Sequence, residues 1–416
     1  MTTTINNKNK KPNVPNSTDK GNAIRNLPNL RFPEFREEWE EHELSEYLDF
    51  KNGLNPKPNQ FGKGIKFISV MDILNNAVIT YDCIRASVSV SEEDMSAFSV
   101  QKGDILFQRS SETLEDVGRA NVYVDDIPAV FGGFVIRGKQ KTNYNPLFFK
   151  YLLSSPLARK RIIRMGAGAQ HFNIGQEGLS KVKLPFACID EQNKIAKILY
   201  LLDKRISLQS KIIDKLQTLI RGISNKLLNT DYGKKTRLGD ILNECSERTK
   251  VNNQYEVLSS TVNGLFSQRE YFSKDIASEN NIGYKILRLH DVVLSPQNLW
   301  MGNINYNDKF EIGIVSPSYK IFSIVDGYDK KYVSALLKTH RALYNYSLVS
   351  EQGASVVRRN LNSEAFEQLT FIIPPIANQR AIGYTISLLR YRLEIENMLK
   401  VTYLSQKQYL LRQMFI

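Results

Sequence analysis

Polar side chains suited to contacting DNA recur in loops of the two halves of this sequence. Arg can form two hydrogen bonds with guanine, Asn or Gln can do so with adenine, and Lys or Arg attracts phosphates. The candidates in the first half are Lys51, Asn52, Ser69, Asp72, Gln108, Arg109, Ser110, Ser111, Gln170 and His171. Those in the second half are Arg248, Thr249, Ser259, Ser260, Thr261, Ser295, Gln297, Asn298, Ser355, Arg358 and Arg359. As a set they predict a DNA-contacting surface, although any single one could equally be an ordinary solvated loop residue.

Motifs for catalysis are weak by comparison. Residues 145–148 read Asn-Pro-Leu-Phe, which is similar to the Asn-Pro-Pro-Tyr tetrapeptide of adenine methyltransferases but lacks its second proline. Asn145 followed by Pro146 also suits the N-cap and first turn of a helix. No Gly-x-x-x-x-Gly-Lys phosphate loop occurs, and the histidines and cysteines lack metal-ligand spacing. We therefore expect no catalytic residue, no metal site and no cofactor in this chain.

The composition favours an anionic partner. The 416 residues include 56 Lys and Arg against 43 Asp and Glu, so the formal net charge is +13. Such a surplus suits nucleic acid or an anionic membrane surface. The apolar runs are far shorter than a membrane span, no secretory signal is recognisable, and the three cysteines are scattered. These features predict a cytoplasmic protein rather than a membrane, secreted or disulfide-stapled one.

The elements that would position these side chains are encoded twice. Residues 44–48, 103–107, 149–153, 168–174 and 184–192 recur in the same order as 238–242, 290–294, 333–337, 353–361 and 373–379. Each copy combines short β-branched runs, such as 65–70 and 313–315, with Gly-, Asn- and Ser-rich turns. The pattern is typical of a tandem duplication of an α/β domain.

Each copy ends in a long helical pattern. In the first, apolar residues follow a 4-3 spacing, interrupted only by Gln209: Ile195, Leu199, Leu202, Ile206, Ile213, Leu216, Ile220, Ile223 and Leu227. The second begins in the same way with Ile382, Ile386, Leu389 and Leu393. Its apolar residues then predict a change of phase, with the pattern continuing through Leu399, Tyr403, Leu410 and Met414. Such spacing predicts an antiparallel coiled coil of the two helices, with copies related by a pseudo-twofold axis. The alternative is an amphipathic helix lying on a globular core.

Five segments follow from these patterns. We predict a disordered basic and polar tail over residues 1–29, a first globular domain over 30–190 and a first long helix over 191–232. A second globular domain over 233–376 and a second long helix over 377–416 follow. The predicted fold class is α/β, with two tandem-duplicated globular domains, each followed by a long α-helix, and the helices paired as an antiparallel coiled coil.

These segments resemble a known family. Residues 30–35 (Leu-Arg-Phe-Pro-Glu-Phe) with Trp39, the 103–106 strand, the 168–170 loop and the turn from Leu184-Pro185 to Glu191-Gln192 resemble the specificity subunit of type I restriction–modification systems. The resemblance extends from about residue 30 to the end of the sequence and includes the duplication. The second copy departs from the pattern with His290 in place of Gly103 and Asn378 in place of Glu191.

The resemblance implies a function without catalysis in this chain. The domains over 30–190 and 233–376 would be target-recognition domains, each reading one half of a bipartite, asymmetric site in double-stranded DNA. The helices over 191–232 and 377–416 would be spacer helices, and their coiled coil would set the gap between the halves. Two methyltransferase subunits and two restriction subunits would supply the S-adenosylmethionine, ATP and Mg²⁺ chemistry in the bacterial cytoplasm. Three other classes remain open: an autonomous DNA methyltransferase, a coiled-coil scaffold that does not bind specific DNA sequences, and a protein that binds anionic membranes.

Overall fold

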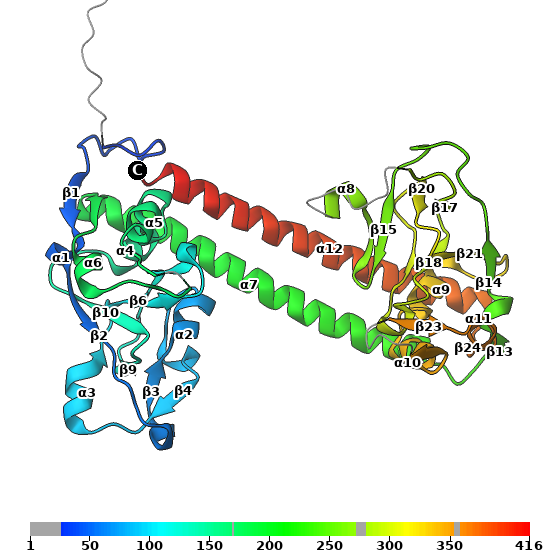
Figure 1. The fold of residues 1–416 in the computed structure, drawn as a ribbon, viewed down its shortest axis with the longest axis horizontal. Helices are drawn as coiled ribbons and strands as arrows, with labels where there is room; N and C mark the ends of the chain where they lie inside the picture. Colours follow the sequence, from blue (N-terminus) through cyan, green and yellow to red (C-terminus); the bar gives the residue numbers. More distant parts are fainter. Residues whose placement is uncertain (1–25, 169, 272–279, 353–357) are drawn as a thin grey trace, which may run out of the picture. The chain divides into compact units, whose positions relative to one another are not determined.

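The computed structural model describes residues 26–168, 170–271, 280–352 and 358–416 and divides the chain into two compact units (Figure 1). Unit 1 comprises Met1–Ser207 with Thr402–Ile416, and unit 2 comprises Leu208–Val401. Each unit therefore contains a segment of both long helices. The predicted tail over residues 1–29 falls mainly on residues 1–25, which lie outside the described residues.

Unit 1 contains two four-stranded sheets. The first has the antiparallel order β2 (Leu48–Asn52), β10 (Val135–Gln140), β6 (Ile105–Gln108) and β8 (Ala120–Val122). The second has the order β4 (Ala86–Val88), β3 (Phe61–Ile68), β9 (Ala129–Phe131) and β5 (Ser99–Val100), in which β3 and β9 are parallel. Two short ladders pair β1 (Glu40–Glu43) with β12 (Lys183–Phe186) and β7 (Ser110–Ser111) with β11 (Phe172–Asn173). The α-helices before the long one are α1 (Leu44–Tyr47), α2 (Val70–Asn75), α3 (Glu92–Phe98), α4 (Pro146–Leu153), α5 (Pro156–Ile163) and α6 (Gln176–Ser180), and the 3-10 helices are η1 (Pro58–Gln60), η2 (Tyr81–Cys83) and η3 (Leu114–Asp116).

Unit 2 repeats the first of these sheets. Its order is β14 (Leu242–Cys245), β21 (Lys320–Ile324), β18 (Val292–Leu294) and β19 (Ile304–Tyr306), again antiparallel. Four two-stranded ladders pair β13 (Lys234–Arg237) with β24 (Thr370–Ile373), β15 (Leu258–Thr261) with β16 (Gly264–Ser267), β17 (Lys285–Arg288) with β20 (Ile312–Val315), and β22 (Ser350–Gln352) with β23 (Arg359–Leu361). Its shorter helices are α8 (Gln268–Tyr271), α9 (Lys330–Leu336), α10 (His340–Leu348), α11 (Ser363–Glu367), η4 (Leu238–Asp240) and η5 (Leu299–Met301).

The strands β6 of unit 1 and β18 of unit 2 are apolar on both faces because each lies between two hydrophobic cores. Along a strand, successive side chains point to opposite faces. In β6, Ile105 and Phe107 pack in the core that contains the α4 residues, whereas Leu106 packs in the core of the second sheet. In β18, Val292 and Leu294 share one core and Val293 lies in another. The uninterrupted apolar run therefore has the same cause in both units.

The departure at His290 leaves the backbone of the repeat unchanged. Gly103 precedes β6 with a φ of 96°, and His290 precedes β18 with a φ of 78°, so both residues adopt the left-handed conformation. Each also donates its backbone N–H to an equivalent carbonyl, Gly103 to Tyr123 and His290 to Asn307, at 2.8 Å. His290 adopts a conformation that glycine adopts more readily, and its ring stacks on Tyr306.

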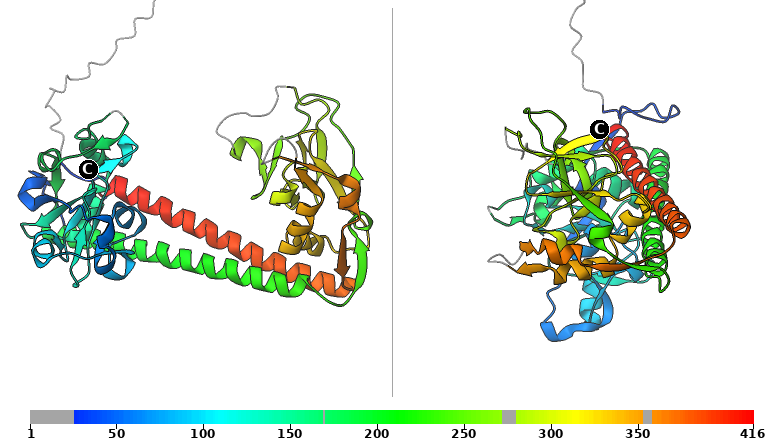
Figure 2. Two further views of the ribbon diagram at one scale, coloured as in Figure 1. Left: turned by 60° about the horizontal axis from the view of Figure 1, so that its bottom comes forward. Right: turned by 90° about the vertical axis from the view of Figure 1, so that its right-hand side faces the viewer.

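The two long helices are α7 (Ile189–Leu228) and α12 (Ile376–Gln413), drawn in green and in orange to red in Figure 2. Within unit 1, Asp203 of α7 contacts Lys407 of α12, and within unit 2, Gln209 of α7 contacts Glu396 of α12. Later residues of α7 meet earlier residues of α12, so the helices are antiparallel, as predicted. All predicted seam residues of α7 are buried or half-buried.

The predicted change of phase in α12 is wrong. The shielded face keeps a 4-3 spacing beyond Leu393 and passes through Glu396, Lys400, Tyr403, Lys407, Leu410 and Met414. Leu399, which suggested the shift, is 37% exposed. Polar residues occupy several seam positions here because polar groups of α7 meet them: the Gln209 amide donates to the backbone carbonyl of Glu396 at 3.0 Å and also to its carboxylate.

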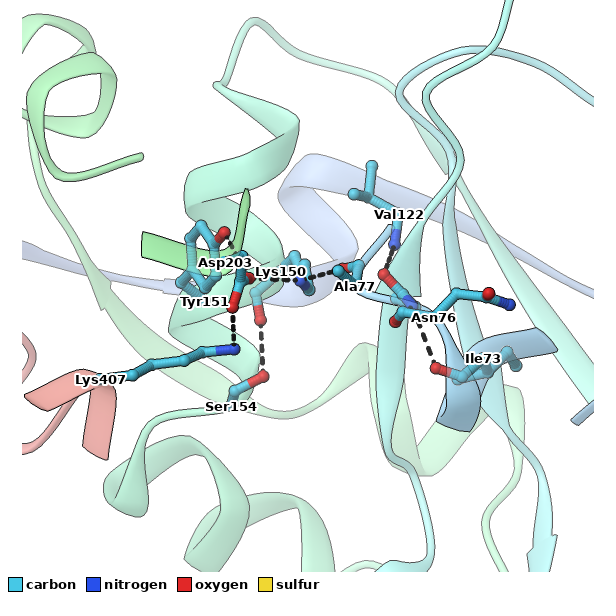
Figure 3. A network of polar contacts seen from close by, with 10 residues as sticks. Ile73, Asn76, Ala77, Val122, Lys150, Tyr151, Ser154, Asp203 and Lys407 are labelled. Carbon is cyan, nitrogen blue, oxygen red and sulfur yellow. Dashed lines mark hydrogen bonds and ion pairs between the residues drawn. The ribbon is translucent and has the colours of Figure 1, made fainter. Parts of the chain in front are cut away.

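A buried polar cluster joins both helices to the rest of unit 1 (Figure 3). The Asp203 carboxylate accepts from Tyr151 Oη at 2.8 Å, from Lys407 Nζ at 2.5 Å and from Lys150 Nζ at 3.3 Å. Lys150 also donates to the carbonyl of Ala77. Burial lowers the pKa of Lys150 to about 8. Burial by itself would raise the pKa of Asp203, but the two lysines hold it below its usual value.

A glutamine ties the start of each long helix to its own unit. Gln192 accepts from the backbone N–H of Asn145 at 3.0 Å and donates to the carbonyl of Ala187 at 2.9 Å. Gln379 makes the same pair of bonds, with the N–H of Asp329 at 3.0 Å and the carbonyl of Pro374 at 2.9 Å. Both side chains are buried. Gln192 therefore fixes the N-terminus of α4 against the long helix α7, and Gln379 fixes the N-terminus of α9 against the long helix α12.

The preceding residue differs between the units. Glu191 is fully buried and accepts from Arg31 Nε at 2.7 Å, Arg31 Nη2 at 2.8 Å and Trp39 Nε1 at 3.0 Å. Asn378, at the equivalent position, donates to the hydroxyl of Tyr232 at 3.2 Å near the surface. The 30–39 segment, which carries much of the family resemblance, is thus anchored to unit 1 through Glu191.

Candidate nucleic-acid interface

In unit 1 the structure brings two of the predicted loops together. The β7–β11 ladder pairs Ser111 with Phe172 and Ser110 with Asn173, and Ser110 Oγ donates to Asn173 Oδ1. Gln170 and His171 lie immediately before β11 and are exposed. The loop that follows β6 and the loop before β11 therefore form one polar surface. Because backbone ladders hold both loops, their side chains are presented on a fixed support.

The loop of residues 132–134 borders this surface. Arg109 donates its backbone N–H to the carbonyl of Phe134 at 2.9 Å and its Nη1 to the carbonyl of Gly133 at 3.3 Å. The Phe134 side chain is 69% exposed. A mainly apolar cavity of about 430 Å³ adjoins it, lined by Ser69, Met71, Ser110 and Phe134 among others. The sequence reasoning missed Phe134, because an apolar residue after Gly-Gly resembles the start of a strand.

Several other predicted residues of unit 1 make hydrogen bonds within the unit. Ser69 caps α2, and both its N–H and its hydroxyl donate to Asp72, at 2.8 and 2.7 Å. Lys51 Nζ donates to the carbonyl of Ala97 at 2.9 Å. Gln108 is buried, and its amide donates to the carbonyl of Ser110 at 2.9 Å, which shapes the loop. Asn52 ends β2 and is half-buried. DNA contacts by these residues stay predictions.

In unit 2 the equivalent loops also meet. Arg359, the first residue of β23, donates its backbone N–H to the carbonyl of Gln297 at 3.1 Å. Its guanidinium lies over the ring of Trp300, with Cζ 4.1 Å from the ring centroid. Gln297 and Arg358 are exposed, and Asn298 immediately precedes η5. Ser355 lies outside the described residues. Sequence reasoning missed Trp300, whose place just after Asn298 was the available signal.

The remaining candidates of unit 2 bond internally. Ser260 Oγ donates to Asn303 Oδ1 at 2.7 Å, and Thr249 Oγ1 donates to the carbonyl of Asn281 at 2.8 Å. Thr261 Oγ1 donates to the carbonyl of Gly264 at 3.2 Å, and Arg248 Nη1 to that of Gly283 at 2.8 Å. Two further predicted residues are also buried: Ser259 and Ser295. Internal bonds of this kind fix the loops, and contact with DNA by these side chains stays a prediction.

One half-buried lysine supports the loops of unit 2. Lys338 Nζ donates to the carbonyl of Gly302 at 2.8 Å, directly after η5, and to that of Val262 at 3.5 Å. Burial lowers the pKa of Lys338 to about 8, and the positive charge of Arg390 acts in the same direction. Lys338 therefore links the β15–β16 turn to the segment that carries Trp300.

Asn145, which was considered for catalysis, has a structural role. Asn145 is the N-cap of α4: its Oδ1 accepts from the N–H of Phe148 at 3.0 Å, and its Nδ2 donates to Asn193 at 2.8 Å. This confirms the capping interpretation. In the parts of the chain that the structure describes, no three His, Cys, Asp or Glu side chains gather as metal ligands would. No helix among those same residues is long and apolar enough to span a membrane.

Comparison with known proteins identifies relatives of this chain. The family model described as "Type I restriction modification DNA specificity domain" matches residues 36–218. A protein described as a type I restriction enzyme MjaX specificity subunit, from Methanocaldococcus jannaschii, is 26% identical over 226 residues, which is 52% of each chain. This chain thus aligns with about half the length of that curated relative.

Solved structures share the fold. The specificity subunit of a type I restriction–modification system from M. genitalium has a TM-score of 0.59 at 15% identity, covering 94% of this chain and 99% of its own. A second solved chain is described as "Structural basis underlying complex assembly and conformational transition of the type I R-M system". Its TM-score is 0.50 at 12% identity, and the match covers 90% of this chain and 96% of that chain. The predicted resemblance and fold class are confirmed. Residues 36–218 match the family model of the type I restriction modification DNA specificity domain, and about half of the chain is similar in sequence to one specificity subunit of a type I restriction enzyme.

Proposed function

We propose that this chain is the DNA-recognition subunit of a type I restriction–modification complex. Each unit reads one half of a bipartite, asymmetric site in double-stranded DNA. The observation that carries the proposal is a four-stranded sheet that is repeated in both units and carries different loops at equivalent positions. Gln108–Ser111 lie beside Gln170–His171 in unit 1, and Ser295–Asn298 lie beside Arg358–Arg359 in unit 2. One support that presents two sets of polar side chains suits the reading of two different half-sites.

The chemistry belongs to other subunits in this proposal. Two methyltransferase subunits bind S-adenosylmethionine and modify adenine, and two restriction subunits use ATP and Mg²⁺. This chain is then non-catalytic and works in the bacterial cytoplasm, where its DNA substrate lies. Its three cysteines are free thiols, which suits a reducing compartment.

An exposed stripe on α12 supports the methyltransferase partnership. Tyr384, Leu388, Tyr391 and Met398 follow the spacing of a second helical seam, and each is more than half exposed. A seam of this kind suits the packing of a further helix. Replacing Leu388 and Tyr391 together with Ser should reduce co-purification of the methyltransferase subunits. Tyr344→Ser, which removes another exposed aromatic side chain from α10, is the matched control and should leave co-purification unchanged.

The decisive test of the function is methylation-aware sequencing of DNA from cells that express this chain with its partner subunits. We expect methylated adenines in one bipartite motif, with both half-sites and their gap defined together. The motif should disappear when this chain is removed and the partner subunits remain. Methylation that persists without the chain would contradict the proposal. Methylation by the isolated chain with S-adenosylmethionine would instead support the autonomous methyltransferase.

Salt dependence separates DNA recognition from a scaffold role. Each phosphate neutralised by Lys or Arg releases counterions, so the logarithm of affinity should fall linearly with the logarithm of salt concentration, with a slope of about −0.9 per neutralised phosphate. The measurement uses the complex with its methyltransferase subunits and DNA that carries the motif. Binding that is flat from low to high salt would favour the scaffold alternative.

The proposal includes the helices as the element that sets the gap. Seven residues inserted into each helix would keep the seam in phase and lengthen the helix pair by about 10 Å, or roughly three base pairs of DNA. We expect both half-sites to stay the same and the gap to widen. An unchanged gap in an active complex would mean that the helices do not set it.

A further inference from the structure

Arg359 stacks on Trp300 in the candidate interface of unit 2. Arg359 Cζ lies 4.1 Å from the centroid of the Trp300 ring. The backbone holds both residues: the N–H of Arg359 donates to the carbonyl of Gln297 at 3.1 Å, and the N–H of Met301 donates to that of Asn298 at 3.1 Å. The long arginine side chain is thereby oriented by contacts within unit 2.

This orientation matters because a free arginine loses rotational freedom when it binds. The guanidinium N–H groups point outward in the plane of the group, so an aromatic ring below that plane leaves its edge accessible. A side chain already held in one orientation loses less conformational entropy when it binds two hydrogen-bond acceptors that lie in one plane. Arg359 Nε is also buried with no hydrogen-bond partner in the described parts of the chain.

Unit 1 has neither residue at the equivalent positions. Asn173, the last residue of β11, and Ile174 after it correspond to Asn360 and Leu361 of β23, so Phe172 stands where unit 2 has Arg359. The 3-10 helix η3 has Glu115 where η5 has Trp300. The shared frame does not require the Arg–Trp stack, so the stack belongs to the part of the interface that differs between the units.

We propose that Arg359 is a specificity-determining residue that reads one guanine in the half-site of unit 2, and that Trp300 is its positioning residue. The inference rests on the proposed function and deepens it. The guanidinium edge donates two hydrogen bonds to O6 and N7 of guanine in the major groove. No other base presents these two acceptors side by side at that edge. Trp300 touches the arginine rather than the base.

The experiment selects bound sequences from a DNA library randomised over both half-sites, using the complex of the full chain with its methyltransferase subunits. The wild type should enrich guanine at one position of the unit 2 half-site. Arg359→Ala should reduce discrimination against the other bases at that position by about 10- to 100-fold. Arg359→Lys, which keeps the charge without the planar fork, should lose most of the same discrimination and guards against misfolding of the alanine variant.

Trp300 variants test positioning, and Arg358 supplies a charge control. Trp300→Leu should weaken the same guanine preference, and Trp300→Phe should restore most of it, because an aromatic face remains available for stacking. Arg358→Ala removes an adjacent positive charge and should lower affinity similarly for all sequences.

The outcomes are distinct. A uniform loss of affinity for all sequences in Arg359→Ala would make Arg359 a phosphate contact and overturn the inference alone. Unchanged preferences in both Arg359 variants, or altered preferences in both half-sites, would also overturn it. A wild-type complex that selects no sequence would overturn the proposed function as well.

Discussion

Units 1 and 2 share a four-stranded antiparallel sheet and equivalent backbone bonds, which together form a common frame, and they differ at definable places. Gln192 and Gln379 make the same two bonds, and Gly103 and His290 make the same left-handed turn. The frame therefore tolerates sequence change wherever the backbone bonds are kept. Side chains on the loops after β6 and β18 differ without disturbing it. A duplicated domain can in this way acquire two specificities on one support.

Exchanging one unit should have the largest effect. Replacing residues 40–185 with the corresponding segment of another specificity subunit should replace one half-site completely and leave the other unchanged, because the interface loops of unit 1 lie within that segment. Methylation-aware sequencing of cells carrying the chimaera measures this. A change in both half-sites would show that the two units do not read DNA separately.

Asp203→Asn should destabilise unit 1 by about 3–5 kcal/mol, because it leaves the ammonium of buried Lys150 without its countercharge. The comparison in unit 2 is Gln209→Leu, which removes a neutral donor from Glu396 and should cost about 1–3 kcal/mol, since Arg392 still pairs with that carboxylate. Denaturant unfolding followed by hydrogen exchange of peptides from each unit separates the two effects. Equal losses would argue against a charge effect at Asp203.

The glutamines offer the matched test of the shared frame. Gln192→Ala and Gln379→Ala should each lower the free energy of unfolding of their own unit by about 1–3 kcal/mol, because each leaves a backbone N–H and a carbonyl without a partner. The same exchange measurement applies. If only one variant lowered the free energy of unfolding, the two glutamines would have the same bonding geometry but would not contribute equally to stability, contrary to this prediction.

Lys150, which is buried, and Lys338, which is half-buried, should give the smallest effect, with the same sign in both units. The pKa of Lys150 and that of Lys338 are each lowered to about 8 by burial. Below pH 8 both states carry the proton, and the folded state bears the full cost of burying the charge. Between pH 8 and about 10.5 the unfolded state binds more protons, so stability should rise with pH, by roughly 1–2 kcal/mol per lysine at pH 9.5.

The control for this pH effect is a pair of methionine variants. Lys150→Met and Lys338→Met each remove one titrating group while keeping an unbranched side chain, so the difference between wild type and variant isolates that lysine. Each difference in the free energy of unfolding should depend on pH only above about pH 8. A difference that stays constant from pH 7 to pH 9.5 would contradict the lowered pKa of that residue.

The sequence predicted the repeated architecture well, because repeated blocks and 4-3 spacing reflect backbone and packing requirements directly. It failed in α12, where Glu396 and Lys407 occupy seam positions that an apolar pattern excludes. Their partners, Gln209 and Asp203, lie on the other helix, so the compatibility of these pairs is visible only once the register is known. Polar residues in a seam can therefore be misread as a change of phase.

The candidate interface was only partly predictable, for a similar reason. Residue type identified Arg359 and Gln170 but could not distinguish them from Ser69 or Thr249, whose hydroxyl groups bond within their own unit. The composition of a loop does not reveal which side chain completes a turn and which faces solvent. Phe134 and Trp300 escaped notice because apolar residues are first assigned to a core, whereas the structure places them beside the interface loops.

The aromatic contacts of Phe415 have a consequence for protein synthesis. Its ring lies 5.5 Å from that of Phe148 and 6.1 Å from that of Trp39, inside the core of unit 1. When the ribosome has translated residues 26–207, the core of unit 1 therefore still lacks Phe415. That core can close only after unit 2 and α12 have emerged. Premature termination within α12 would leave unit 1 with exposed apolar surface, a signal by which cellular proteases can recognise the incomplete chain.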